Sequence, residues 1–150
     1  MGTIFFILFV FFTIVNLGFI ISSLVYAYQD SACVLAVPDG FSFNLKTWLQ
    51  VDAYLRIALI TLLLVVAIVS CINFKAGVGL AFCVICTMLI YSLFSFAWTI
   101  VGSVLYWGKL NPTGICTGGV HDYMYALLII TYITICLNCI VSGKQGKSQN

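Results

Sequence analysis

Two Cys-x-x-Cys pairs are the residues that most resemble a reactive or metal-binding site in this sequence: Cys83 with Cys86, and Cys136 with Cys139. Pairs with this spacing occur in redox centres and in structural zinc sites. A structural zinc ion needs four convergent nitrogen or sulfur ligands, and the single histidine, His121, does not accompany these cysteines in the expected helices. We therefore interpret the four cysteines as small, buried, apolar side chains and predict no metal site and no cofactor.

Charged residues are scarce, with six Lys or Arg and four Asp or Glu among 150 residues. No carboxylate, lysine or histidine falls in the middle of an expected span, where proton relays and ion-coupled carriers place their ionisable groups. We therefore predict no catalytic residues. Asp52 and Arg56 have the i, i+4 spacing of a helix ion pair. We predict that they pair at the external membrane interface, as an exposed pair that does not line a conduction path.

The composition is that of a membrane protein. Hydrophobic residues make up 63% of the chain and charged residues 7%, against about 45–50% and about 25% in soluble domains. This difference excludes a water-soluble globular domain. The basic residues are scattered singly and form no basic patch, so we predict no binding to nucleic acid.

Apolar runs recur along the chain, and each is long enough to cross a bilayer, which takes about 20 helical residues. We predict an all-α membrane protein with four transmembrane helices in an antiparallel bundle with short loops. The expected spans are residues 3–27, 47–73, 80–106 and 123–141, with a tight turn at residues 74–79. Residues 1–143 then form the transmembrane domain, and residues 144–150 form a polar cytosolic tail.

The two longer loops each carry one cysteine, Cys33 in the first and Cys116 in the last. With four spans, both loops face the same side of the membrane, and a disulfide between them requires an oxidising lumen or exterior. We predict this bond, which puts both termini in the cytosol of a protein of the plasma membrane or secretory pathway. The alternatives are that both cysteines stay free or that each bonds to another chain. The basic residues do not decide the orientation, because they are divided evenly between the two sides.

A few small or polar residues inside the spans are candidates for close helix packing. Asn16 lies near the middle of the first span, where an amide is expected to hydrogen-bond to another helix, and Gly18 and Ser22 lie close to it. Gly79 and Gly102 are two further positions where helices could approach closely. Because added bulk separates helix backbones, we expect Gly18→Leu to disturb packing or association more than Asn16→Leu.

Several segments share a pattern of aromatic residues, glycine and cysteine. KTWLQVDAYLRI begins at Lys46, FSFAWTIVGSVLYW begins at Phe94, and YMYALLIITYI begins at Tyr123. Together with Cys33 and Cys116, these segments resemble the transmembrane protein 272-like family of small four-span membrane proteins. The resemblance runs from the first loop into the fourth span and excludes the first helix. It implies the architecture and no particular activity.

The short loops leave the spans as the main surface for recognition. We therefore expect a non-catalytic accessory or structural subunit in the lipid bilayer, which assembles through its transmembrane helices into a homo-oligomer or a larger membrane-protein complex. The alternative is a subunit of an oligomeric channel or pore, lined by weakly polar residues such as Thr, Ser and Asn. A lipid-modifying or redox enzyme is the least supported class.

Overall fold

The computed structural model describes residues 2–29, 31–72 and 74–147, and these residues form helices and loops but no strand. In chain order the helices are α1 (Gly2–Ala27), α2 (Ala32–Leu35), α3 (Leu45–Ile72), α4 (Phe74–Ser103), the π-helix η1 (Val104–Leu110), the 3-10 helix η2 (Asn111–Thr113) and α5 (Gly119–Lys147). The described part of the chain is therefore all-helical, as predicted.

Three described segments are long and apolar enough to cross a membrane: Leu45–Val69, Cys86–Thr113 and Gly119–Cys136. The segment Thr13–Ala27 of α1 is also apolar but shorter. Helices of this kind suit a bilayer because each satisfies its backbone hydrogen bonds internally. The fold thus supports the prediction of a membrane protein.

Local sequence determines where the helices begin and end. The side-chain oxygen of Asn44 accepts a hydrogen bond from the Thr47 backbone N–H at 3.0 Å, which caps the start of α3. Pro112 lies in the first turn of η2, where its missing N–H is not needed. Gly114 ends η2 with a φ of 69°, a left-handed conformation that favours glycine.

Two predicted boundaries are wrong. Residues 74–79 form no turn, because α4 already begins at Phe74. Their glycines do not stop the helix, since glycine is common in apolar membrane helices and no proline lies in this segment. The last helix continues to Lys147, so residues 144–147 are helical, while residues 148–150 lie outside the described residues.

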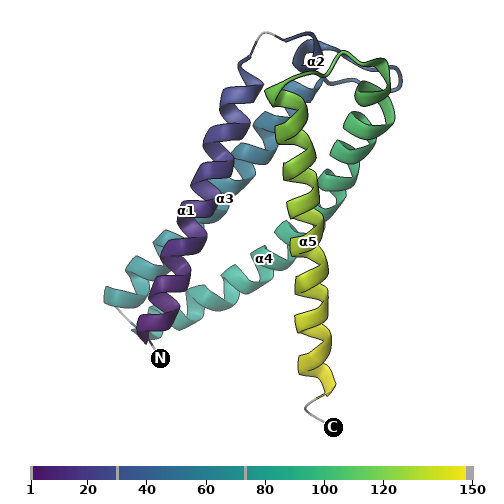
Figure 1. Ribbon diagram of the computed structural model, residues 1–150. Coiled ribbons are helices and arrows are strands. Elements are labelled where there is room, and N and C mark those ends of the chain that lie inside the picture. The colour runs from purple at the N-terminus through teal and green to yellow at the C-terminus, as the bar shows by residue number, and fades with distance from the viewer. Residues whose placement is uncertain (1, 30, 73, 148–150) are drawn as a thin grey trace.

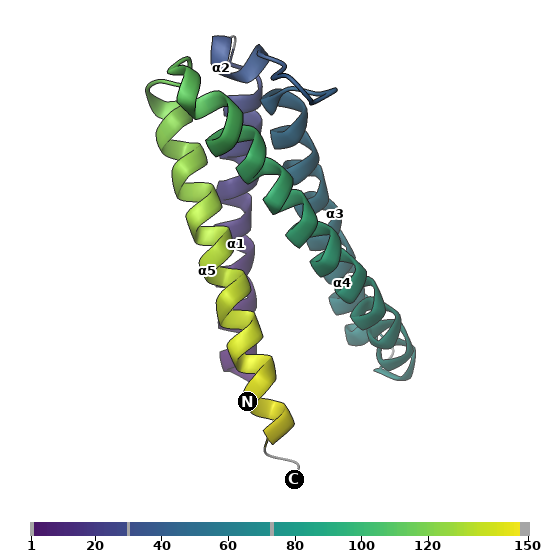
Figure 2. The ribbon, with the colours of Figure 1, turned by 90° about the vertical axis from the view of Figure 1, so that its right-hand side faces the viewer.

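The long helices come together at one end of the molecule, and toward the other end α5 diverges from the pair formed by α3 and α4 (Figures 1 and 2). We call the end that holds α2 and the connection from η2 to α5 the closed end, and the opposite end the open end. Helix α1 packs along α3 and α3 packs along α4, whereas α5 makes fewer contacts. The start of α1 and the end of α5 both lie at the open end (Figure 1).

The apolar core lies toward the closed end. Its largest buried side chains come from α3, η1 and α5: Leu45, Leu49, Leu105, Tyr106, Leu110, Met124, Leu127 and Leu128. Farther along α5, Ile130 and Ile133 are 44% and 53% exposed. The core therefore fixes the helices at the closed end, and α5 is more exposed beyond it.

Candidate functional site

A disulfide joins Cys33 in α2 to Cys116 in the connection before α5, as predicted. The two cysteines lie 83 residues apart in the sequence, and both are buried in the core. Bridges that close loops of this kind typically stabilise a fold by about 2–4 kcal/mol. This bond ties the segment that follows α1 to the segment that precedes α5.

A pair of tryptophans joins α3 to α4 below the disulfide. The Trp48 indole N–H donates to the Trp98 carbonyl at 2.9 Å, and the Trp98 indole N–H donates to the Trp48 carbonyl at 3.4 Å. A Cβ atom added to Gly102 would overlap the Trp48 ring and would lie 2.8 Å from its Nε1. Gly102 is therefore a helix-packing position, because only a hydrogen leaves room for the indole.

Gly18 and Gly79 do not pack closely within the chain. A Cβ atom added to either glycine would meet no described atom within 4 Å. The expectation that these glycines bring helices of this chain together is therefore wrong. Both glycines face open surface, and a role in contacts with another chain stays a prediction.

The serine that links α1 to α5 is Ser23 rather than Ser22. The Tyr123 hydroxyl donates to the Phe19 carbonyl at 3.1 Å and lies 2.6 Å from the Ser23 hydroxyl. Because a phenol has one proton, Ser23 is the donor in the second hydrogen bond. Ser22 is half-buried one residue away. The sequence showed two adjacent serines but could not show which one faces α5.

The predicted ion pair is present, with Arg56 Nε 2.8 Å from Asp52 Oδ2 and Arg56 Nη2 3.4 Å from Asp52 Oδ1. The expectation of an exposed pair is wrong, since the two side chains are only 16% and 14% exposed. The pair lies against α1, where Arg56 Nη1 donates to Asn16 Oδ1 at 3.5 Å and the guanidinium covers the Phe19 ring. Helix α1 therefore covers the charges that the sequence analysis expected to be exposed at the membrane interface.

Arg56 lies near the middle of the membrane-compatible segment Leu45–Val69. Its distance from the start of that segment is roughly 16 Å at about 1.5 Å per residue, which is half of a ~30 Å hydrocarbon layer. The expectation that no carboxylate, lysine or histidine lies in mid-span stays a prediction. Ionisable residues inside apolar spans usually face the interior of the protein and mark functional sites.

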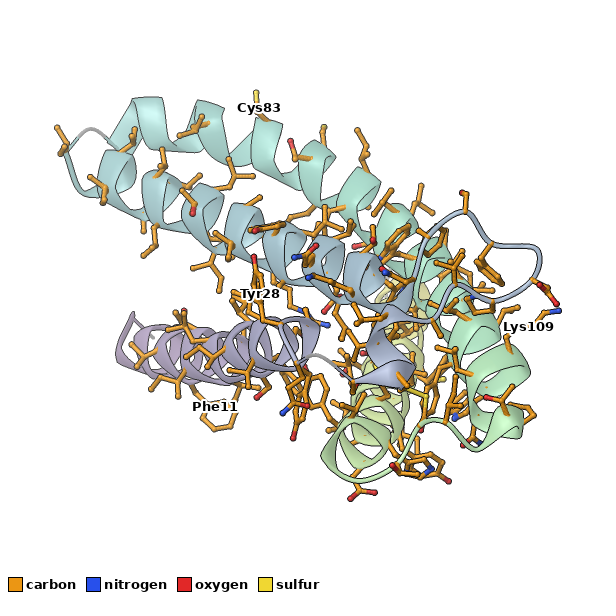
Figure 3. The ribbon with its side chains drawn as sticks, turned by 90° about the horizontal axis from the view of Figure 1, so that it is seen from above. Phe11, Tyr28, Cys83 and Lys109 are labelled. Atoms are coloured by element: carbon orange, nitrogen blue, oxygen red, sulfur yellow. A yellow bond between two sulfur atoms is a disulfide. The ribbon has the colours of Figure 1, made fainter. Side chains whose placement is uncertain are left out.

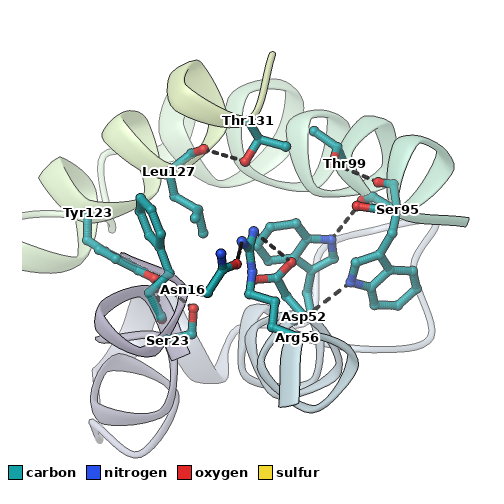
Figure 4. A network of polar contacts seen from close by, with 12 residues as sticks. Asn16, Ser23, Asp52, Arg56, Ser95, Thr99, Tyr123, Leu127 and Thr131 are labelled. Atoms are coloured by element: carbon teal, nitrogen blue, oxygen red, sulfur yellow. Dashed lines mark hydrogen bonds and ion pairs between the residues drawn. The ribbon is translucent and has the colours of Figure 1, made fainter. Parts of the chain in front are cut away.

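Arg56 and Asn16 line a cavity of about 490 Å³ between α1, α3, α4 and α5. Figure 4 shows the two side chains pointing toward the space that separates them from Leu127 and Thr131 of α5. The other polar lining residues are Tyr91, Ser92, Ser95, Thr131 and Thr134. The remaining walls are apolar: Val15, Phe19, Leu59, Met88, Phe96, Leu127, Ile130 and Ile135.

The hydroxyl groups of the cavity were missed by the sequence analysis. Ser92 and Ser95 lie three residues apart on α4, and Thr131 and Thr134 have the same spacing on α5. This spacing puts each pair on one face of its helix. It could have indicated two polar faces, but it could not show that both faces meet Arg56.

These hydroxyls present oxygen acceptors to the cavity. Ser92 donates to the Met88 carbonyl at 2.8 Å. Thr134 likewise donates to the Ile130 carbonyl at 2.8 Å, and Thr131 also donates within α5. The protons of Ser92, Thr131 and Thr134 are thus held by their own helices, and the oxygen lone pairs of these three hydroxyls stay available. The guanidinium supplies N–H donors, so the cavity offers a ligand both hydrogen-bond donors and hydrogen-bond acceptors.

The thiols that the structure describes and the histidine form no comparable site, and Cys139 lies outside the described side chains. Cys83, Cys86 and Cys136 are exposed on helix surfaces, so the expectation of buried cysteines is wrong for these three. Figure 3 shows Cys83 projecting away from the other helices. His121 lies 3.2 Å from the exposed Asp122 carboxylate. Within the part of the chain that the structure describes, no three His, Cys, Asp or Glu side chains gather to hold a metal ion.

Comparisons with protein-family models, curated proteins and solved structures found no match. The resemblance to the transmembrane protein 272-like family therefore stands on the sequence segments alone. The functional proposals therefore rest on the cavity around Arg56 and on the closed end.

Proposed function

We propose that this chain is a non-catalytic integral membrane protein with four antiparallel spans, and that it acts as an accessory or structural subunit. In this proposal it assembles with itself or with a larger membrane-protein complex through its transmembrane helices. Helix α1 serves as the first span, since its 26 residues would extend about 39 Å at about 1.5 Å per residue. That length exceeds the ~30 Å hydrocarbon layer.

We further propose that the closed end faces the lumen or the cell exterior. Disulfides such as Cys33–Cys116 form and persist in oxidising compartments. The start of α1 and the end of α5 lie at the opposite end of the molecule (Figure 1). Both termini would then be cytosolic, in a protein of the plasma membrane or the secretory pathway.

The observation that carries the assembly proposal is the separation of α5 from the other helices. Leu127 and Leu128 are buried, but Ile130 and Ile133 are about half exposed, and Figure 2 shows the α3–α4 pair diverging from α5. A helix of a second chain can pack on this half of α5. Single membrane hydrogen bonds average only about 0.6 kcal/mol, so close packing has to supply most of the association free energy.

Native mass spectrometry of the protein in mild detergent tests the proposal. We expect a defined oligomer or a complex with a larger protein, and we expect Ile133→Trp to shift it toward the monomer. The matched control is Ile68→Trp, which changes an isoleucine of similar exposure on α3. A monomer under all conditions, or an oligomer unaffected by Ile133→Trp, would contradict assembly through α5.

An oligomeric pore is the second candidate, because Arg56 lines the cavity together with the hydroxyls of α4 and α5. A ring of identical subunits in the mass measurement would favour it. The direct test is conductance in a reconstituted bilayer. If Arg56→Gln changed ion selectivity while assembly stayed normal, the pore would replace the accessory role.

A further inference from the structure

The cavity around Arg56 has the size and composition of a small-molecule site. Its volume of about 490 Å³ falls within the roughly 300–1,000 Å³ of typical ligand pockets. Such pockets are mostly apolar and hold a few polar groups that orient the ligand. We infer that this cavity binds a neutral membrane lipid that carries a free hydroxyl group, of the sterol or diacylglycerol type.

The charges at the site favour an uncharged ligand. Asp52 binds Arg56 through two hydrogen bonds, so the guanidinium and the carboxylate together carry no net charge. A fatty-acid carboxylate or an amine placed beside this pair would add one uncompensated charge in a low-dielectric environment, which is strongly unfavourable. A hydroxyl group adds none. The Asp52–Arg56 pair thus selects against charged amphiphiles.

The hydrogen-bonding groups of the cavity complement a hydroxyl group. A guanidinium has five N–H donors. Among the described residues, Arg56 donates two of these hydrogen bonds to Asp52 and one to Asn16. The other two can donate to a ligand oxygen. Ser92 and Thr134 direct their own protons to helix carbonyls, so their oxygens can accept the ligand's proton. A ligand hydroxyl can therefore accept from Arg56 and donate to α4 or α5.

The apolar walls suit the hydrocarbon part of the same ligand. Phe19 and Leu59 line the side formed by α1 and α3, and Met88 and Ile135 belong to α4 and α5. Ser92 and Thr134 are themselves exposed, so the cavity opens to the surface of the helices rather than being sealed. A lipid can enter sideways from the bilayer and place its hydroxyl group beside Arg56.

This inference goes beyond the proposed function, because every residue of the site comes from one chain. A monomer can therefore bind the lipid without a second chain. Failure of the assembly proposal in the mass measurement therefore leaves this inference standing. Failure of lipid binding likewise leaves the assembly proposal standing.

Photoaffinity labelling of the full-length protein in lipid nanodiscs tests the inference. The probes are a sterol, a diacylglycerol and a fatty acid, each with a diazirine and an alkyne, and labelled peptides are mapped by mass spectrometry. We expect the sterol or the diacylglycerol to label peptides of the cavity wall, in competition with the unlabelled lipid. Whichever of the two is labelled more identifies the source of the hydroxyl group. Preferential labelling by the fatty acid, or labelling confined to the outer helix surfaces, would overturn the inference.

Two variants that fill the cavity make the test specific. Ser92→Leu and Thr134→Leu add bulk from opposite walls, and each should lower labelling about tenfold or more, the equivalent of about 1.4 kcal/mol. Thr61→Leu is the matched control, because Thr61 is also an exposed hydroxyl that donates to its own helix, at 2.9 Å to the Ile57 carbonyl. The Cys33–Cys116 bond, read on a non-reducing gel, reports that each variant is folded. Unchanged labelling in both folded cavity variants would overturn the inference.

Discussion

The closed end and the cavity below it use polar groups in different ways. At the closed end, neutral donors bind backbone carbonyls at short range, as in the Trp48–Trp98 pair and the Tyr123–Phe19 contact. In the cavity, the Arg56 guanidinium and several hydroxyls face a space that the chain leaves unfilled. The closed end thus holds the helices together, and the cavity keeps polar groups available for a ligand.

The largest expected effect concerns the ion pair between Asp52 and Arg56 beside the cavity. Asp52→Leu leaves Arg56 without its carboxylate in a mostly buried position, and breaking such a pair typically costs about 3–5 kcal/mol. We expect a correspondingly lower free energy of unfolding in an SDS titration from mixed micelles. The double variant Asp52→Leu/Arg56→Leu should recover most of the loss, because it leaves no uncompensated charge.

A failure of that recovery would change the comparison. If the double variant were as unstable as Asp52→Leu, the two residues would act through packing rather than through charge. The cavity would then differ from the closed end in volume only.

The second prediction concerns the disulfide of the closed end. Cys33→Ser should lower the free energy of unfolding by about 2–4 kcal/mol, since the unfolded chain gains freedom when the bridge is lost. Thermal unfolding in detergent measures the effect. Cys86→Ser is the control, because Cys86 is an exposed free thiol that should tolerate the change. Equal losses in the two variants would show that the bridge adds nothing specific.

These two contacts also show what could be predicted from the sequence. The Cys33–Cys116 bond followed from one cysteine in each of two loops on the same side, which is a matter of chain order. The Asp52–Arg56 pair followed from i, i+4 spacing, which is a matter of one helix. Both depend on local or topological features that a sequence carries directly.

The surroundings of the pair could not be predicted in this way. Periodicity shows that Asp52 and Arg56 share a face of α3, but it does not show that Asn16 and Phe19 of α1 cover this face. For the same reason, the sequence could not show which of Gly18 and Gly102 packs against another helix. Both are small residues inside apolar helices, and only the rotation of each helix decides that Gly102 meets Trp48 while Gly18 meets open surface.

The third prediction compares these two glycines. Gly102→Ala should lower the free energy of unfolding by about 1–3 kcal/mol, because the new methyl group overlaps the Trp48 ring and forces a shift. Gly18→Ala should cause no loss and can add up to about 1 kcal/mol, since alanine favours helix. Unfolding in detergent measures both. A larger loss at Gly18 would mean that α1 packs on another chain there, as the sequence suggested.

The smallest expected effect tests the hydrogen bonds that join α1 to α5. Tyr123→Phe removes the phenol that donates to the Phe19 carbonyl and accepts from Ser23. Hydrogen bonds within membrane proteins average about 0.6 kcal/mol and reach about 1.7 kcal/mol, so we expect a loss of about 1 kcal/mol. The loss should show in the same SDS titration. Tyr125→Phe, which changes an exposed tyrosine two residues away, is the control.

A double variant separates the two hydrogen bonds of Tyr123. Ser23 is fully buried, so Tyr123→Phe leaves its hydroxyl without this partner, and Ser23→Ala leaves the Tyr123 hydroxyl with only the Phe19 carbonyl. The two changes should therefore be less than additive in Ser23→Ala/Tyr123→Phe, as expected for residues in direct contact. Full additivity would mean that the serine and the tyrosine stabilise the fold independently. The attachment of α5 to α1 would then depend on apolar packing alone, and the closed end would differ less from the open end than the hydrogen bonds indicate.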